Sequence, residues 1–462
     1  MPKTPSEELE TFLARQEPAA LVGLLLELAA QHEVVQKRLS RLQLADRPEK
    51  LAADFRRTLT AWRRSKRFLD YRRAGEFARE LEDWLGQVER ELLPRDPAAA
   101  LALFEQFIEA DGTWLERADD SDGSIGDAVR TACGLWLRAA ARAPEPPGGW
   151  VERLTRLARA DEYGARAELL GSAGLLLDES QLRGLVGHYQ AMMTRTIAEG
   201  SGRGELPIEV FQISGTLSLL AGALRDPDVH VRAVLSYSPT PNEVQRHRFV
   251  REYLEADRPA DALEWLSGHW GHLEDSRRSL LADALGRLGR REESAALRYE
   301  ILERTLSVHD LQRWLEDLPE TAHADARERA RKLAIDDDRD PIAAARLLLE
   351  IGEPLLAESR LVASTGRIDG NDYGRLVPLA EALGEHGLSR GEALVYRALL
   401  QAILDRAYTR AYGHAARYWR RLSEIADSGV ELLPLTPHDD FAAQIRQRHG
   451  RKIAFWTRVN AG

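Results

Sequence analysis

Apolar side chains recur every three to four positions along most of this chain, which is the spacing that places them on one face of an α-helix. The residues Val395, Leu399, Ala402 and Ile403 form one such stripe. Runs rich in Val, Ile and Thr, which favour strands, are scarce. The pattern therefore predicts an almost wholly α-helical protein.

Clusters of proline, glycine and polar residues interrupt this pattern, because they cannot continue a helix. The interruptions lie at residues 200–204, 336–341 and 366–371, and at the two candidate domain boundaries, 144–149 and 238–241. These two boundaries predict an N-terminal helical region at 1–143, a middle helical region at 150–237 and a C-terminal repeat region at 242–462. Helices between interruptions are short and follow each other closely, which favours antiparallel pairs.

An internal repeat supports the prediction of paired helices. The segment Leu281–Gly286 (LADALG) recurs 98 residues later as Leu379–Gly384 (LAEALG), and each copy is followed by a turn glycine, Gly289 or Gly387. The offset is close to three times the length of roughly 33–34 residues that is typical of tetratricopeptide-like units. We therefore predict an all-α fold, an α-solenoid of degenerate antiparallel helix pairs of tetratricopeptide-like type.

Other segments bear on the compartment. The longest apolar stretch, Leu21–Ala30, is too short to span a bilayer and predicts a buried helix instead. Residues Thr4–Glu7 resemble a helix-capping box rather than a signal peptide. Cys133 is the single cysteine, and its apolar surroundings predict a buried, inert thiol. These features predict a cytoplasmic protein without a membrane partner.

Charge is unevenly distributed along a chain whose net charge is −10. Residues 56–73 contain eight Arg and Lys against one Asp, and residues 406–458 contain ten Arg and Lys against five acids. Two basic patches on an acidic protein suggest anionic partners.

The first basic patch mixes cations with aromatic residues. Cations neutralise phosphates and aromatic rings stack on unpaired bases, so this segment is a candidate nucleic-acid contact. The alternative is an amphipathic helix whose aromatic residues face the core and whose arginines pair with acidic neighbours. The candidate contacts are Arg63, Arg64, Lys66, Arg67, Arg72 and Arg73.

Carboxylates and glycines alternate between Asp119 and Asp127, a composition that can enclose a divalent cation with oxygen ligands. The spacing departs from an EF-hand loop, because Ile125 stands at the glycine position and Thr131 at the glutamate position. The alternative is a tight turn that caps the next helix through Ser124 or Asp127. The candidate metal ligands are Asp119, Asp120, Asp122 and Asp127.

Cations also recur at helical spacing near the C-terminus, beside a core stripe that contains Tyr412 and Trp419. If these helices pack together, their cations form a groove for an acidic peptide or a phosphate. The alternative is a solvated face with internal ion pairs. The candidate partner-binding residues are Arg410, His414, Arg417, Arg421, Arg448, Arg451 and Lys452.

Several motifs together resemble a known family. They are Phe68–Tyr71, Asp119–Asp127, Ala411–Tyr418, His449–Lys452 and the pair Phe455–Trp456. The chain is similar to an uncharacterised bacterial all-α family, a domain of unknown function. It also resembles the helical region that follows the zinc finger in bacterial SWIM-type proteins. The resemblance implies a helical fold without a defined activity, and the zinc finger itself is missing because the chain has one cysteine.

Three functions are compatible with these features. The first is a non-enzymatic helical-repeat scaffold or adaptor that binds a protein or peptide in a bacterial cytoplasmic complex. Solenoids form extended binding surfaces, and the chain has no Gly-x-Ser-x-Gly, Walker or dinucleotide motif. The second is a nucleic-acid-associated protein that uses the two basic patches. The third is a metal-dependent hydrolase that uses the aspartate cluster. We expect no cofactor for the first two, and a divalent cation for the third alone.

Overall fold

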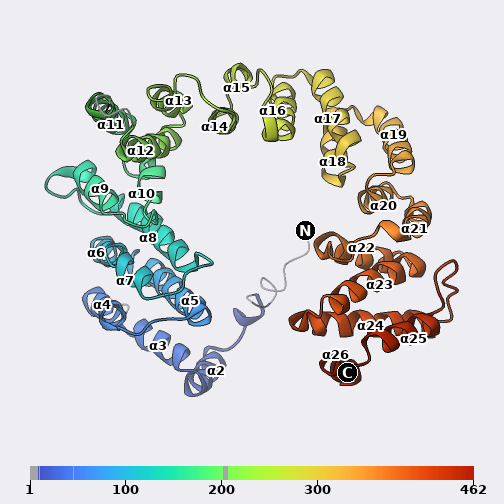
Figure 1. The fold of residues 1–462 in the computed structure, drawn as a ribbon. Helices are drawn as coiled ribbons and strands as arrows, with labels where there is room; N and C mark the ends of the chain where they lie inside the picture. Colours follow the sequence, from blue (N-terminus) through green and yellow to red (C-terminus); the bar gives the residue numbers. More distant parts are fainter. Residues whose placement is uncertain (1–8, 10, 45, 201–205, 462) are drawn as a thin grey trace. The chain divides into compact units, whose positions relative to one another are not determined.

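The computed structural model describes residues 9, 11–44, 46–200 and 206–461, which form helices joined by turns and loops (Figure 1). The one β-type feature among them is an isolated parallel bridge between Leu69 and Ala118. The prediction of an all-α protein is confirmed. The capping box predicted at Thr4–Glu7 lies outside the described residues, as do residues 201–204 of one predicted interruption.

The chain divides into two compact units between Pro241 and Asn242. Unit 1 contains the following helices: α2 (Pro18–Gln31), α3 (Glu33–Leu42), α4 (Pro48–Arg64), α5 (Tyr71–Gln87), α6 (Pro97–Ile108), α7 (Asp111–Glu116), α8 (Ser124–Ala140), α9 (Gly149–Arg159), α10 (Glu168–Gly171), α11 (Glu179–Gly200), α12 (Ile208–Leu224) and α13 (Pro227–Leu235).

Unit 2 contains α14 (Glu243–Glu255), α15 (Pro259–Trp265), α16 (Glu274–Arg287), α17 (Arg291–Thr305), α18 (Val308–Asp317), α19 (His323–Asp336), α20 (Pro341–Glu350), α21 (Pro354–Ala363), α22 (Tyr373–Glu385), α23 (Ser389–Asp405), α24 (Tyr412–Asp427), α25 (His438–His449) and α26 (Ile453–Asn460). Short 3-10 turns, such as Thr409–Ala411 before α24, lead into several of them.

Local sequence explains where many helices begin and end. Proline occupies the first turn of α2, α4, α6, α13, α15, α20 and α21, where its missing N–H costs nothing. Asn242 and Gln245 form a reciprocal capping box at the start of α14. The described interruptions predicted from proline and glycine separate α8 from α9, α13 from α14, α19 from α20 and α21 from α22.

The two copies of the internal repeat fold in the same way. One copy forms the contacting helices α16 and α17, and the other forms the contacting helices α22 and α23. The turn glycines Gly289 and Gly387 have φ values of 76° and 69°, a left-handed conformation that glycine adopts without strain. The repeated letters therefore correspond to equivalent helix pairs.

Unit 1 has one continuous hydrophobic core that runs from α4 to α13. The core crosses the proline-rich segment 144–149, because the rings of Trp136 on α8 and Trp150 on α9 lie 6.1 Å apart in a T-shaped contact. Hence the predicted regions 1–143 and 150–237 share one core. In unit 2, a second core extends from Ala295 to Phe455.

Candidate binding surfaces

The segment between α4 and α5 presents a row of cations to solvent. We call residues 63–73 the basic linker; its central part, residues 65–70, is not helical. The side chains of Arg63, Arg64, Lys66 and Arg67 are exposed, and none forms an ion pair with a described residue. Arg72 and Arg73 pair with Glu76 at 3.3 Å and with Asp70 at 4.0 Å, and both arginines remain largely exposed.

The aromatic residues around the basic linker divide into two groups. Trp62 is half-buried and makes T-shaped contacts with Phe77 and Trp84, with ring centroids 5.8 and 6.1 Å apart. By contrast, Phe68 is 62% exposed and Tyr71 is 56% exposed. The core-facing alternative considered from the sequence therefore describes Trp62 but does not describe Phe68 or Tyr71.

Two sets of contacts hold the basic linker against the segment that follows α7. Leu69 donates its N–H to the carbonyl of Arg117 at 2.8 Å, and its own carbonyl accepts the N–H of Asp119 at 2.9 Å. The Arg117 guanidinium donates to the carbonyls of Trp62 at 2.9 Å and Ser65 at 2.7 Å. Burial lowers the pKa of Arg117, and its guanidinium also lies 4.9 Å from the Phe77 ring centre. Nothing in the spacing of the sequence identified Arg117 as this anchor.

The aspartate cluster forms a capped turn at the start of α8. Asp120 accepts the N–H groups of Ile125 at 2.8 Å and Gly126 at 3.0 Å, which satisfies free donors of the first helical turn. Asp122 accepts from the backbone and the hydroxyl of Ser124, and these hydrogen bonds lower its pKa. The remaining carboxylates engage side chains, Asp119 with Ser121 and Asp127 with Arg130.

Metal coordination has no support from this geometry. Across the part of the chain that the structure describes, no group of three or more His, Cys, Asp or Glu side chains is placed to hold a metal ion. The cap is supplied by Asp120, whereas the sequence pointed to Ser124 or Asp127. Because α8 begins at Ser124, the carboxylate that reaches its free N–H groups lies one turn before it.

The predicted C-terminal cations have two different environments. Arg421 binds the buried carboxylate of Glu392 through two N–H groups, at 2.6 and 3.2 Å, and this pairing raises its pKa. Arg448 pairs with Asp405 at 3.2 Å, and Arg417 donates to His414 at 2.8 Å. Four of the cations are exposed or half-buried and form no ion pair with a described residue, and of these Arg417 has the hydrogen bond to His414; they are Arg410, Arg417, Arg451 and Lys452.

The elements that hold these cations do pack together. Helix α24, which holds His414, Arg417 and Arg421, contacts α25, which holds Arg448. A nearby pocket at the end of α24 is lined by Asp427, Glu431 and Asp439 and by none of the predicted cations. The structure therefore brings the helices together but does not place the cations in that pocket.

Helix α2 is the apolar surface that the sequence did not predict. The stretch Leu21–Ala30 is helical as expected, but no residue of α2 is buried, and the expectation of a buried helix is wrong. Its exposed residues include Val22 (54%), Leu25 (41%) and Leu26 (64%). A single charged residue, Glu27, lies within the 14 residues of this helix. Helices that are apolar on all sides are normally covered, so α2 is a strong candidate for a binding surface.

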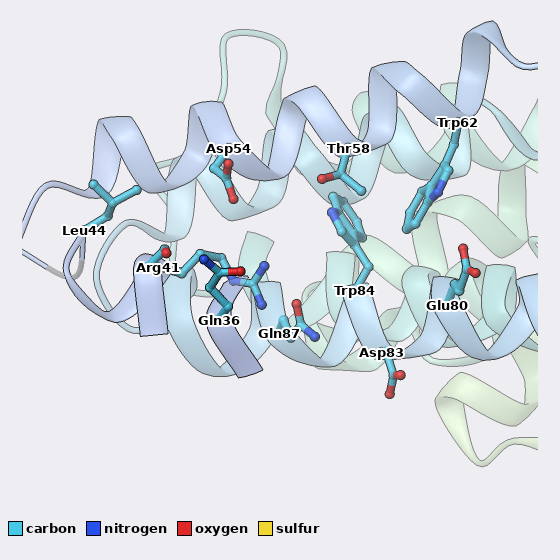
Figure 2. Close-up of a pocket in the computed structure, with 11 residues that line it drawn as sticks. Gln36, Arg41, Leu44, Asp54, Thr58, Trp62, Glu80, Asp83, Trp84 and Gln87 are labelled. Carbon is cyan, nitrogen blue, oxygen red and sulfur yellow. The ribbon is translucent and has the colours of Figure 1, made fainter. Parts of the chain in front are cut away.

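A pocket opens between α3, α4 and α5 (Figure 2). Trp84 projects from α5 toward Thr58 on α4, and its buried indole N–H has no acceptor among the described residues. Arg41, on α3, pairs with Glu91 at 3.2 Å. The other lining residues are Gln36, Ser40, Leu44, Asp54, Trp62, Glu80, Asp83 and Gln87.

These surfaces and the fold define a class, an all-α protein of short, sequentially packed helices with exposed apolar and basic surfaces. The chain belongs to a family of unknown function, DUF6880, whose sequence model matches residues 10–458. This match confirms the expected uncharacterised helical family, whereas the likeness to SWIM-type proteins stays a prediction. Neither a curated protein nor a solved structure matches the chain. In the described part of the chain, every helix is too short or too polar to cross a membrane.

Proposed function

We propose that this protein is a non-enzymatic helical-repeat scaffold that binds a protein partner, and that its helices form an α-solenoid of antiparallel, tetratricopeptide-like pairs. The order of helix contacts supports this proposal. In unit 2, α16 contacts α17, α17 contacts α18, α22 contacts α23 and α23 contacts α24. Contacts between near neighbours are typical of repeat proteins, which use their long surfaces to bind partners.

Exposure of α2 is the observation that carries the proposal. Helices that are apolar on all sides are normally covered by other parts of a protein, and α2 has one charged residue in 14 and no buried residue. Val22, Leu25 and Leu26 lie at positions i, i+3 and i+4, so they share one face of the helix. A partner that presents an apolar helix face would cover these side chains in the way that successive helices of the array cover each other.

The unpaired C-terminal cations are a second contact surface in this proposal. Arg410, Arg417, Arg451 and Lys452 are available to an acidic segment of the partner, whereas Arg421 and Arg448 are used within the protein. Charge reversal at Arg417 and Arg451 should weaken the complex without changing helicity. Unaltered binding would exclude this surface as part of the interface.

The single cysteine supports a cytoplasmic location for the scaffold. Cys133 is fully buried and free, as expected of a chain that needs no disulfide in a reducing compartment.

The experiment replaces Val22 and Leu26 by lysine, a good helix former that adds charge to the exposed face. The partner recovered with the tagged wild-type chain is purified, and its affinity for each variant is measured by calorimetry. We expect the Val22→Lys/Leu26→Lys variant to bind at least about tenfold more weakly, since burying two unpaired charges is costly. Leu355→Lys is the matched control, because Leu355 is 73% exposed on α21.

Two results would contradict the proposal. Equal affinity of the α2 variant and the wild type would remove α2 from the interface. A concentration-dependent dimer of the isolated chain, seen by light scattering and abolished in the α2 variant alone, would assign α2 to self-association rather than to a separate partner.

A further inference from the structure

We propose that the basic linker is a binding site for single-stranded nucleic acid, in which its cations contact phosphates and Phe68 and Tyr71 stack on bases. This inference rests on the basic linker alone and does not depend on the scaffold role. It assigns a ligand class to a surface that the scaffold proposal leaves without a function.

Four cations of the basic linker are free to bind an external anion. Arg63, Arg64, Lys66 and Arg67 have no ion pair with a described residue, although acidic residues outnumber basic ones in the chain as a whole. The one acid within the basic linker, Asp70, accepts the N–H of Arg73 at 3.1 Å and caps α5. Like charges so close together repel each other, and a phosphate backbone relieves that repulsion.

The backbone contacts of the basic linker determine which side chains face solvent. Leu69 is held by hydrogen bonds to Arg117 and Asp119, and its side chain packs against the core of unit 1. Successive side chains of an extended segment point to opposite sides, so Phe68 faces outward when Leu69 faces inward. The basic linker is thus held in place before any ligand arrives, which reduces the entropy lost on binding.

Tyr71 extends the same surface onto the first turn of α5. A pocket at this turn is lined by Tyr71 together with Asp70, Arg72, Arg73 and Glu76. Arg72 is the most exposed of these cations, with 90% of its side chain accessible. An aromatic ring next to exposed guanidinium groups is the combination that binds a base and its adjacent phosphate.

The exposed rings favour a single strand over other anionic ligands. A duplex keeps its bases stacked on each other, so its phosphates would contact the cations while Phe68 and Tyr71 would contact no base. An acidic peptide would likewise need the cations alone. Single strands offer unpaired bases along with phosphates, and therefore use both groups of side chains.

The test uses the full-length chain and fluorescein-labelled 20-nucleotide oligo(dT) and oligo(U), with binding followed by fluorescence anisotropy. Four phosphate contacts predict that affinity falls about 50-fold between 50 and 200 mM salt. Replacing Arg63, Arg64, Lys66 and Arg67 by alanine should flatten this salt dependence and weaken binding at 50 mM salt. Phe68→Ala and Tyr71→Ala should each weaken binding by about tenfold with little change in the salt dependence.

The matched control replaces four cations of unit 2 that also lack ion pairs, Arg410, Arg417, Arg451 and Lys452, by alanine. Its affinity should stay within about twofold of the wild type, and circular dichroism should show unchanged helicity in all variants. Competition with a duplex of equal length, with polyglutamate and with phosphatidylserine vesicles should be weaker than competition with unlabelled single strands.

Four outcomes would overturn the proposal. They are no binding at 50 mM salt, equal losses in the linker and control variants, full affinity of the aromatic variants, and competition by duplex, polyglutamate or vesicles that equals competition by single strands. Full affinity of the aromatic variants would show a cation surface without base stacking. Equal competition by duplex, polyglutamate or vesicles would reassign the basic linker to another anionic partner.

Discussion

Arg166 binds Asp111 through two parallel hydrogen bonds of 2.7 Å, and both side chains are buried. Asp111 is the first residue of α7 and Arg166 precedes α10, so the pair connects segments on both sides of the proline-rich interruption at 144–149. A third N–H of Arg166 donates to the carbonyl of Leu157 at 2.9 Å. This ion pair is one reason that unit 1 has one core.

Loss of one partner of this pair should destabilise unit 1 strongly. Asp111→Ala leaves a buried, unpaired guanidinium, and we expect a loss of about 3–5 kcal/mol in the free energy of unfolding. Replacing both residues, as in Asp111→Leu/Arg166→Met, should restore most of that loss because no buried charge remains. The urea dependence of Cys133 exposure measures the free energy of unfolding of the single and the double variant. A double variant as unstable as Asp111→Ala would contradict this explanation.

Cys133 should itself be unreactive in the native protein. It is fully buried on α8, and burial raises the pKa of its thiol. Because the thiolate is the reactive form, we expect no reaction with a thiol reagent at pH 8 until urea unfolds unit 1. Since the chain has one cysteine, the labelling rate reports the opening of this unit specifically. Rapid labelling without urea would show that α8 opens in the native state.

Two tryptophans of unit 1 should respond differently to the same substitution. The indole of Trp136 donates to the Glu105 carboxylate at 3.0 Å, whereas the indole N–H of Trp84 has no acceptor among the described residues. Both changes to phenylalanine remove similar ring volume, so Trp136→Phe should cost about 1–3 kcal/mol more than Trp84→Phe. Exposure of Cys133 in urea gives both values, and equal losses would argue against a contribution from the Trp136 hydrogen bond.

Glu105 should make the stability of unit 1 dependent on acid pH. Burial raises its pKa, but hydrogen bonds from Arg153, Trp136 and Arg156 outweigh that effect and lower the pKa overall. The pKa of the group is therefore lower in the folded state than the value of about 4.3 expected for the unfolded chain. Its stabilising contribution is complete above that value and is lost as the pH falls through the lower pKa of the folded state.

The measurement compares the midpoint of urea unfolding, followed by circular dichroism, between pH 7 and pH 3. For the wild type, we expect the urea concentration at the midpoint to decrease once the pH is below about 4.3. The Glu105→Gln variant should have a lower urea midpoint at pH 7, and this midpoint should change less with pH. Parallel curves for the two proteins would show that other carboxylates control the acid transition.

Close backbone packing in unit 2 should make Gly370 intolerant of a side chain. A Cβ at this position would clash with the backbone carbonyl of Ala398 on α23. We therefore expect Gly370→Ala to destabilise the protein by about 1–3 kcal/mol, as overpacking does elsewhere. Gly366→Ala is the control, because a Cβ there meets no atom within 4 Å. Urea unfolding followed by circular dichroism measures both, and similar midpoints would contradict the expected clash.

Features that depend on residues close together in the sequence were predictable from the sequence alone. Proline and glycine predicted the described interruptions, and the repeated LADALG and LAEALG segments both form helix pairs with a left-handed glycine between them. The buried environment of Cys133 was predictable for the same reason, because an apolar stripe at helical spacing faces the core.

Features that depend on distant residues were not predictable. The stripe that contains Arg421 indicated a cationic surface, yet Arg421 is paired with Glu392, 29 residues away. The sequence favoured a core-facing position for the aromatic residues of this segment, but Phe68 and Tyr71 are exposed beside Leu69, which is held by hydrogen bonds to Arg117 and Asp119.

By itself, the sequence determined the helices, their turns and the separation of charge, because these depend on short-range geometry and on composition. Only the tertiary structure decided which cations are free and which apolar helix is uncovered. Ion pairing and burial depend on the side chains that packing brings together, and the apolar residues of α2 would have the same letters whether covered or exposed.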